Sequence, residues 1–222
     1  GACDPEGVEG PWSDYWLPVG PATDWVTAVV AGALDDASIR VGVSPPGVLA
    51  ALDAADRFLG EPRAGGWGYN RTVEPDTDST AAAARFLRRR RALSPDVGRF
   101  LAERQRPDGG FSTYLADDAW GTSHPCVTPV VALVLDDLGI DFDRDATLAY
   151  VQRMGRSDGS WPAYWWRGSH YATYNTLALL VRWGCAPAGW RPVVGGRASE
   201  EVRSVLDLAC VVGALSITSP GP

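Results

Sequence analysis

The sequence predicts an all-α fold, and within that class an α/α toroid of repeated helical hairpins. Apolar residues recur with the period of a helix in several segments, whereas strand-like alternation is absent over any useful length. A unit of roughly 45 residues also repeats along the chain. In each unit an amphipathic helix ends near a Gly-rich aromatic turn, and a loop leads to a second, more apolar helix. The more apolar helices would form the inner ring of the toroid.

The repeat is clearest in the middle of the chain. The complete hairpin repeats are 46–91, 95–139 and 143–184. The aromatic anchors of their turns are Trp67, Phe111 and Trp161, which lie 44 and 50 residues apart. The second helices are expected to begin at Thr80, Thr128 and Thr173. Pro46 and Pro95 stand where the first helices of two repeats would begin, since proline is well suited to the first turn of a helix.

The two ends of the chain fit the repeat less well. We interpret 12–45 as a partial first repeat, 185–215 as a degenerate last repeat and 216–222 as a loose tail. The prediction is therefore a single domain over residues 1–222. Because its helices are too few for a complete double ring, the ring would be incomplete or closed by a partner chain.

Composition and charge exclude several classes of protein. A net charge of −7 argues against a nucleic-acid partner, which needs a basic face. No apolar run reaches the roughly 18 residues of a membrane span, and no signal peptide is recognisable, so a cytoplasmic location is expected. The four cysteines have no metal-ligand spacing and are expected to be free thiols. Ten tryptophans predict broad aromatic surfaces, in a core or around a cavity.

The most specific motif is an acidic cassette that follows the first aromatic turn. Gly65-Gly66-Trp67-Gly68-Tyr69 is followed, after a short loop, by Pro75-Asp76-Thr77-Asp78-Ser79-Thr80-Ala81. The two acids open an otherwise apolar helix, which would place their carboxyl groups at the mouth of an apolar interior. Acids at a helix N-terminus also cap free N–H groups and suit the helix dipole, and this is the structural alternative.

Together these motifs resemble those of squalene–hopene cyclases and of class II terpene cyclases in general. The segment from Gln152 through Asp158-Gly159-Ser160-Trp161 to Tyr171-Ala172-Thr173 is similar to the family's Gln-Trp repeat. The acidic cassette is similar to the family's catalytic Asp-rich segment. The resemblance covers roughly residues 46–184, and more faintly 12–45. It implies the toroid, and cyclisation started by protonation of an alkene or epoxide, with no metal or organic cofactor.

The resemblance also implies roles for individual residues. Asp78 matches the general acid and Asp76 the first acid of the motif, which would tune Asp78, while Ser79 is a candidate hydrogen-bond partner of the acid. The substrate-binding candidates are Tyr69, Trp165, Tyr171, His170 and Trp25. A neutral carboxylic acid in a dry site can protonate a π-bond, and aromatic faces attract the cation that results.

Two positions depart from the bacterial pattern of this family. Ser79 replaces the third acid, and Val130 stands where the family has the histidine partner of the general acid; His170 is a substitute candidate. Oxidosqualene cyclases carry one acid followed by a small polar residue and Thr-Ala, and Asp78-Ser79-Thr80-Ala81 fits that variant, which protonates an epoxide. The choice between an alkene and an epoxide stays open.

Three other groups of residues point to different sites. Zinc ligands of the kind found in protein prenyltransferases could come from Asp117, Asp118, His124, Cys126 and His170, but Ala172 stands where that family has its histidine, so we predict no metal. Asp136, Asp137 and Asp141 suggest a Mg-diphosphate site and are better explained as a helix end and a solvated turn. The run 88–91 is four arginines; it could hold a diphosphate or an acidic lipid and is interpreted as a solvated helix end.

The sequence thus predicts a class II terpene cyclase-like enzyme acting on a hydrophobic, polyprenyl-derived small molecule. The alternative is a non-catalytic protein that binds a hydrophobic ligand or serves as a scaffold on the same toroid. A peripheral membrane contact and a homodimer are further partners that the sequence leaves open.

Overall fold

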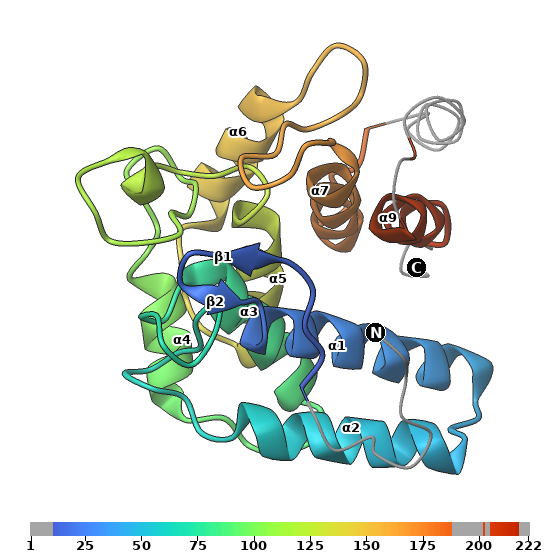
Figure 1. Ribbon diagram of the computed structural model, residues 1–222. Helices are drawn as coiled ribbons and strands as arrows, with labels where there is room; N and C mark the ends of the chain where they lie inside the picture. Colours follow the sequence, from blue (N-terminus) through green and yellow to red (C-terminus); the bar gives the residue numbers. More distant parts are fainter. Residues whose placement is uncertain (1–10, 188–201, 203–204, 218–222) are drawn as a thin grey trace. The chain divides into compact units, whose positions relative to one another are not determined.

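The computed structural model describes residues 11–187, 202 and 205–217 (Figure 1). These residues form eight α-helices, one short 3-10 helix and one pair of two-residue strands. The chain divides into two compact units, 1–103 and 104–222. Much of the predicted degenerate repeat 185–215 and most of the predicted tail 216–222 lie outside the described residues. None of the described helices is long and apolar enough to cross a membrane.

The first unit contains a small hairpin and four helices. Its elements are β1 (Trp16–Leu17), β2 (Gly20–Pro21), α1 (Asp24–Val41), α2 (Pro46–Leu59), α3 (Thr77–Leu87) and α4 (Pro95–Ala102). The strands pair antiparallel, with Trp16 opposite Pro21. Helix α1 packs against both α2 and α3, and α3 also packs against α4. The four successive alanines 81–84 of α3 are all buried, because small side chains let the neighbouring helices approach closely.

The second unit repeats the same kind of helical packing. Its elements are the 3-10 helix η1 (Ala119–Gly121) and the helices α5 (Thr128–Leu138), α6 (Arg144–Met154), α7 (His170–Arg182) and α9 (Val205–Leu215). Helix α5 packs against α6 and α7, and α7 also packs against α9.

The mostly helical fold agrees with the sequence prediction, whereas the toroid stays a prediction. The helix pairs α2/α3, α4/α5 and α6/α7 fall within the three predicted hairpins. The boundary between the two units lies inside the second hairpin, just after α4. Two predicted helix starts are wrong. Helices α3 and α7 begin three residues before Thr80 and Thr173, at Thr77 and His170, and only α5 begins at its threonine.

The three threonines have a different structural role, which explains their repetition. The side-chain Oγ1 of each accepts a hydrogen bond from the backbone N–H of the aromatic anchor in its own turn. The N–O distances are 3.0 Å for Trp67–Thr80, 2.9 Å for Phe111–Thr128 and 3.1 Å for Trp161–Thr173. In two repeats the indole N–H also donates to the preceding helix, from Trp67 to Leu59 O and from Trp161 to Val151 O. Each turn is thereby tied to the helix that follows it, and in these two repeats also to the helix before it.

This arrangement predicts a shared effect of removing the hydroxyl groups. Replacing Thr80, Thr128 or Thr173 by valine keeps the shape but leaves a buried backbone N–H without its acceptor, so each variant should lower the free energy of unfolding by about 1–2 kcal/mol. Urea unfolding measures the change. Thr122→Val removes an exposed hydroxyl and is the matched control. A loss no larger than in this control would show that the three hydroxyls do not hold the turns.

The arginine run follows directly on α3, as the predicted helix end requires, but three of its side chains form ion pairs and are not simply solvated. Arg89 pairs with Asp35 and Asp36 of α1, and Arg90 and Arg91 both pair with Asp56 of α2. These arginine side chains are only 20–28 % exposed. These three arginines join α3 to α1 and α2, and their charges are already paired with acids of the protein.

Asp136 lies in the last turn of α5, at the helix end that the sequence predicted, but its carboxylate is buried and not solvated. Its side chain is 5 % exposed and accepts a hydrogen bond of 2.6 Å from Trp183 Nε1. Arg144 and Arg182 pair with the same carboxylate, so Asp136 joins α5 to α6 and α7.

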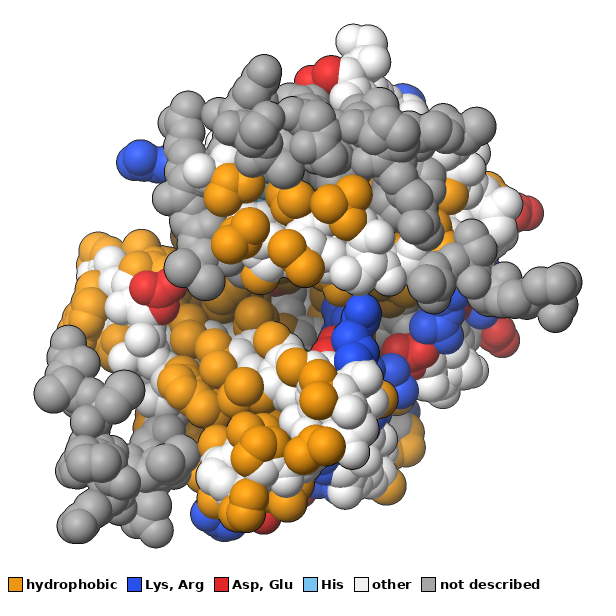
Figure 2. All heavy atoms as spheres, turned by 90° about the vertical axis from the view of Figure 1, so that its right-hand side faces the viewer, with side chains coloured by type: hydrophobic (Ala, Val, Ile, Leu, Met, Phe, Trp, Pro, Cys, Tyr) orange, Lys and Arg blue, Asp and Glu red, His pale blue; other side chains and the backbone are white. Residues whose placement is uncertain are grey.

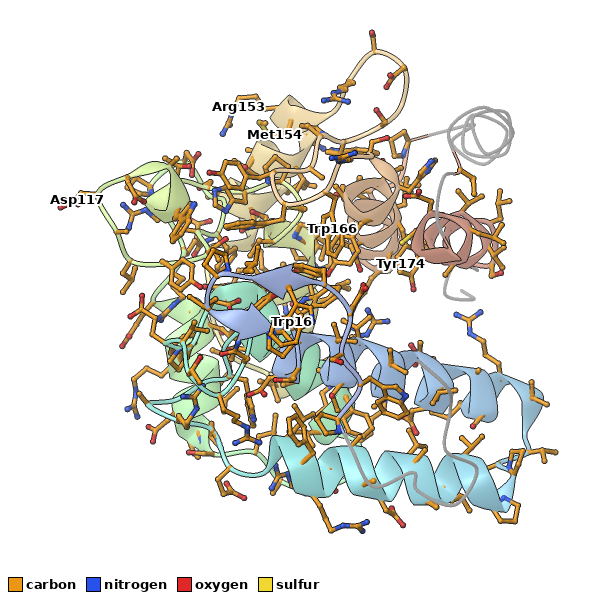
Figure 3. The ribbon with its side chains drawn as sticks, viewed as in Figure 1. Trp16, Asp117, Arg153, Met154, Trp166 and Tyr174 are labelled. Carbon is orange, nitrogen blue, oxygen red and sulfur yellow. The ribbon has the colours of Figure 1, made fainter. Side chains whose placement is uncertain are left out.

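A group of exposed apolar side chains lies where α1 passes into α2. Figure 2 shows the side of the molecule on which apolar side chains gather over the ends of these two helices. The exposed residues are Ile39, Val41, Val43 and Leu49. Trp16 of the β-hairpin is the most exposed large apolar residue of the described chain, at 75 % (Figure 3).

Candidate active site

The acidic cassette forms the first turn of α3. Asp76 is the N-cap residue in an extended conformation, and its carboxylate accepts hydrogen bonds of 2.7 Å from both the backbone N–H and the hydroxyl of Ser79. Burial raises the pKa of Asp76 to about 6, although these hydrogen bonds oppose the rise. The sequence predicted a hydrogen bond from Ser79 to the general acid, Asp78. In the structure, the hydroxyl of Ser79 donates to Asp76 instead.

Asp78 lies in the same helical turn and is also buried, with 8 % of its surface exposed. Its Oδ2 accepts a hydrogen bond of 3.0 Å from Nε1 of Trp25, which is 53 residues earlier in the chain and lies in the first turn of α1. The structure thus brings together three predicted catalytic residues, Asp76, Asp78 and Ser79, with one predicted substrate-binding residue, Trp25. Glycine is needed in the adjoining turn, because a Cβ on Gly66 would lie 2.4 Å from Thr80 Oγ1.

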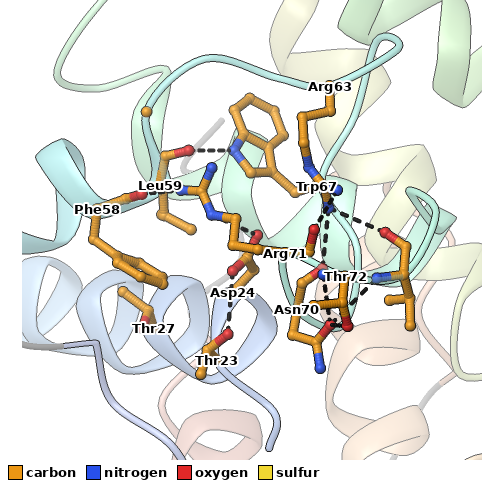
Figure 4. Close-up of polar contacts among 12 residues, drawn as sticks. Thr23, Asp24, Thr27, Phe58, Leu59, Arg63, Trp67, Asn70, Arg71 and Thr72 are labelled. Atoms are coloured by element: carbon orange, nitrogen blue, oxygen red, sulfur yellow. Dashed lines mark hydrogen bonds and ion pairs between the residues drawn. The ribbon is translucent and has the colours of Figure 1, made fainter. Parts of the chain in front are cut away.

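The start of α1 is anchored to the loop that precedes the cassette (Figure 4). The backbone N–H of Thr23 donates to Tyr69 O at 3.2 Å, and Arg71 Nε pairs with Asp24 Oδ2 at 3.3 Å. The Asp24 side chain is fully buried, and burial raises its pKa against the opposing charge of Arg71. Arg63 in turn donates to the carbonyl oxygens of residues 70, 71 and 73, which fixes the loop. Sequence reasoning missed Asp24 and Arg71, since no motif links them.

Tyr69 holds the N-terminal hairpin next to the cassette. Its hydroxyl donates to Tyr15 O at 3.0 Å, and its ring centroid lies 5.6 Å from that of Tyr15. Asn70 Nδ2 donates to the carbonyl oxygens of Val19 and Pro21 in the same hairpin. The pKa of Tyr15 is raised to about 12, first by burial and then by the negative charges of Tyr69, Asp78, Asp14 and Asp76. Tyr15 is therefore a third missed residue near the acids.

The remaining substrate-binding candidates belong to the second unit. Trp165 lies in an aromatic cluster, where its Nε1 donates to Thr113 Oγ1 at 2.9 Å and its ring lies 4.9 Å from that of Tyr164. His170 and Tyr171 begin α7, and the Tyr171 ring packs 5.1 Å from that of Trp166, which is labelled in Figure 3. Because these residues and the acidic cassette belong to different units, a shared aromatic cavity stays a prediction.

The candidate zinc ligands do not converge. Both ring nitrogens of His124 are engaged, one with Thr113 Oγ1 at 2.7 Å and the other with Ala119 O at 2.9 Å. Burial lowers the pKa of His124, whose ring stacks on Tyr164 at 4.1 Å. Asp117 is exposed at the tip of its loop (Figure 3). Among the described residues, no group of three or more His, Cys, Asp or Glu side chains could hold a metal ion.

Comparison with known proteins finds similarity to terpene cyclases. No family model matches the chain. The drimenyl diphosphate synthase of Streptomyces showdoensis is 34 % identical in an alignment of 148 positions, which covers 62 % of this chain and 26 % of that protein. A structure of the type II terpene cyclase MstE from Scytonema, in complex with its substrate geranylgeranyl dihydroxybenzoate, is 25 % identical with a TM-score of 0.67, over 87 % of this chain and 58 % of that one. The chain is class II terpene cyclase-like.

A further solved structure, of a protein from Actinoplanes, matches this terpene cyclase-like chain over 96 % of its length and 70 % of that protein. Its identity is 27 % and its TM-score 0.75. The chain spans about a quarter of the curated relative that it matches. The likeness thus supports the terpene cyclase class, while the specific squalene–hopene cyclase repeat stays a resemblance of sequence motifs.

Proposed function

We propose that this chain is a terpene cyclase-like enzyme in which Asp78 donates the proton that starts cyclisation of a polyprenyl-derived alkene or epoxide. The observation that carries the proposal is the pair of buried carboxyl groups at the N-terminus of α3, one of which, Asp78, is held by Trp25 at 3.0 Å. A mere capping role needs one acid, and Asp76 fills it. Asp78 is then a second buried acid that capping does not explain.

The proposed reaction moves one proton and no other group. The carboxyl proton of Asp78 passes to the terminal carbon of an alkene, or to the oxygen of an epoxide, and the carbocation that forms is attacked by the next double bond of the substrate. Loss of a proton from the last cation ends the cyclisation, so the product is an isomer of the substrate. Asp76 would keep Asp78 protonated, because a charged Asp76 opposes a second negative charge nearby.

The aromatic residues are proposed to surround the substrate. Tyr69, Trp165, Tyr171 and His170 would line a cavity of an α/α toroid, and the faces of their rings would stabilise the cations. Exclusion of water from such a cavity would prevent early quenching of these cations. The proposed roles of these residues require no metal or organic cofactor.

The relatives guide the choice of substrate. One similar enzyme is a drimenyl diphosphate synthase, and the other, MstE, has geranylgeranyl dihydroxybenzoate as its bound substrate. Polyprenyl diphosphates and prenylated aromatic acids are therefore the first compounds to test, together with plain polyprenyl alkenes and epoxides. Incubation with the purified chain, read by mass spectrometry coupled to chromatography, should give a product of unchanged mass and new retention time. If none of these compounds were converted, the result would count against the proposal.

The alternative is a binding protein on the same fold. It is favoured by Val130, which replaces the family histidine, and by the engagement of Ser79 with Asp76. A binding protein would leave every compound unchanged, yet one of them would raise the melting temperature of the chain. The exposed apolar residues between α1 and α2 would suit a homodimer or a peripheral membrane contact, and both stay proposals.

A further inference from the structure

The indole of Trp25 contacts the candidate acid through its edge. Trp25 is 7 % exposed, so its N–H group lies in a place where a polar group needs a partner. That partner is Oδ2 of Asp78, at 3.0 Å, in a buried hydrogen bond between α1 and α3. Sequence reasoning placed Trp25 among the residues that would bind the substrate. In the structure, however, the indole N–H of Trp25 contacts the carboxyl group of Asp78.

The start of α1 is anchored by contacts that fix the position of Trp25 next to Asp78. Three successive residues, Thr23, Asp24 and Trp25, are each joined to the segment 69–78. The backbone N–H of Thr23 is bonded to Tyr69 O, and the carboxylate of Asp24 is paired with Arg71. Since the two residues before Trp25 are fixed in this way, the indole is held against Asp78 by the loop that carries the cassette.

A hydrogen bond donated to a carboxyl group changes how easily that group ionises. An N–H donor interacts more strongly with a carboxylate than with a carboxylic acid, because the acceptor is then charged. The indole N–H would therefore interact most strongly with Asp78 as its proton leaves. Interactions that strengthen on the way to the transition state are the ones that accelerate a reaction.

We propose that Trp25 is a positioning residue that orients the carboxyl group of Asp78 and stabilises the carboxylate formed when Asp78 gives up its proton. The proposal rests on the proposed function of Asp78 as general acid. Other ionisable groups near Asp78 in the first unit are Asp76 at the N-cap of α3, and Tyr15 with its neighbours Asp14 and Tyr69 at the hairpin. All of them are left unchanged in the test.

The test compares Trp25→Phe with the wild type in kcat, KM and the dependence of kcat on pH. Phenylalanine keeps an aromatic ring and removes the donor. We expect kcat to fall about 10- to 100-fold with little change in KM, which is the size expected for a hydrogen bond to a charged group. Because the carboxylate loses a stabilising donor, Asp78 should hold its proton to higher pH. The fall of kcat on the alkaline side should therefore move up by about one pH unit.

Two further variants keep the result interpretable. Trp16→Phe makes the same substitution at an exposed tryptophan of the same unit and should leave the pH profile unchanged. If Trp25→Phe fails to fold, site-specific 3-benzothienylalanine at position 25 replaces the N–H by sulfur and keeps the bicyclic shape. The proposal would be overturned if the alkaline fall of kcat did not shift while the product mixture changed. That result would mean that the ring of Trp25 acts on the cations.

A measurement without turnover separates this proposal from the proposed function. Infrared difference spectra between proteins with and without Asp78→Asn isolate the carboxyl signal of Asp78. Its titration can be followed in the wild type and again in the Trp25→Phe variant. A titration midpoint of Asp78 that rises in the Trp25→Phe variant supports the link between Trp25 and Asp78. If no compound were cyclised as well, only the proposed function would fail. An unchanged midpoint would overturn the link, whatever the chain does with substrates.

Discussion

Replacing Asp78 by asparagine should reduce cyclisation by about 10²- to 10⁴-fold or more while the protein stays folded. The amide has no proton acidic enough to give to a π-bond or an epoxide, so the starting step is lost. The fold should survive, because the amide oxygen of asparagine can still accept the hydrogen bond from Trp25 Nε1. Product formation by chromatography and mass spectrometry, together with the melting temperature, measures the two effects.

The matched control for this variant is Asp96→Asn. Asp96 also lies in the first turn of a helix, α4, where it is exposed and paired with Arg99. The control removes the same charge from the same kind of helix position, and hence the same interaction with the helix dipole. Activity should be kept in Asp96→Asn. Activity kept in a folded Asp78→Asn protein as well would remove Asp78 from the role of general acid.

The helices could be predicted from the sequence because hydrophobic period and turn residues act locally. Pro46 and Pro95 do begin their helices, and Gly139 ends α5 in a left-handed conformation with φ of 66°. The starts of α3 and α7 were missed because the repeated threonines bond to the preceding turns and do not cap. Sequence repetition indicated that these threonines matter, but only their partners in space explain why.

The acids of the site could be predicted from the sequence, whereas the residues that contact them could not. Asp76 and Asp78 lie together in the first turn of α3, as their spacing of two residues requires. The contact of Asp78 with Trp25, and the pairing of Asp24 with Arg71, join segments about 50 residues apart, where no local pattern operates. The ion pairs of Arg89, Arg90 and Arg91 could not be predicted for the same reason, since their acidic partners lie on α1 and α2.

The stability of the protein should depend on pH through Asp76. Its pKa is raised from 3.8 to about 6 in the folded state by burial. The neutral form is therefore favoured by folding, and the stability that this contributes is fully present below pH 3.8 and is lost as the pH rises through about 6. A rise of about two pKa units corresponds to about 3 kcal/mol. From about pH 4 to about pH 7, the wild type should lose free energy of unfolding on the order of this amount relative to Asp76→Asn, which stays neutral.

Urea unfolding of both proteins at several pH values measures this difference. Asp24 is buried in both proteins, so its own titration cancels when the two curves are subtracted. Asp143→Asn is the control for the loss of a capping carboxylate, because Asp143 caps α6 from an exposed position by accepting a hydrogen bond from Ala146 N at 2.9 Å. A difference that does not vary between about pH 4 and about pH 7 would mean that the hydrogen bonds from Ser79 fully offset the effect of burial. Asp76 would then be a carboxylate at neutral pH, and it would act on Asp78 there as a fixed negative charge.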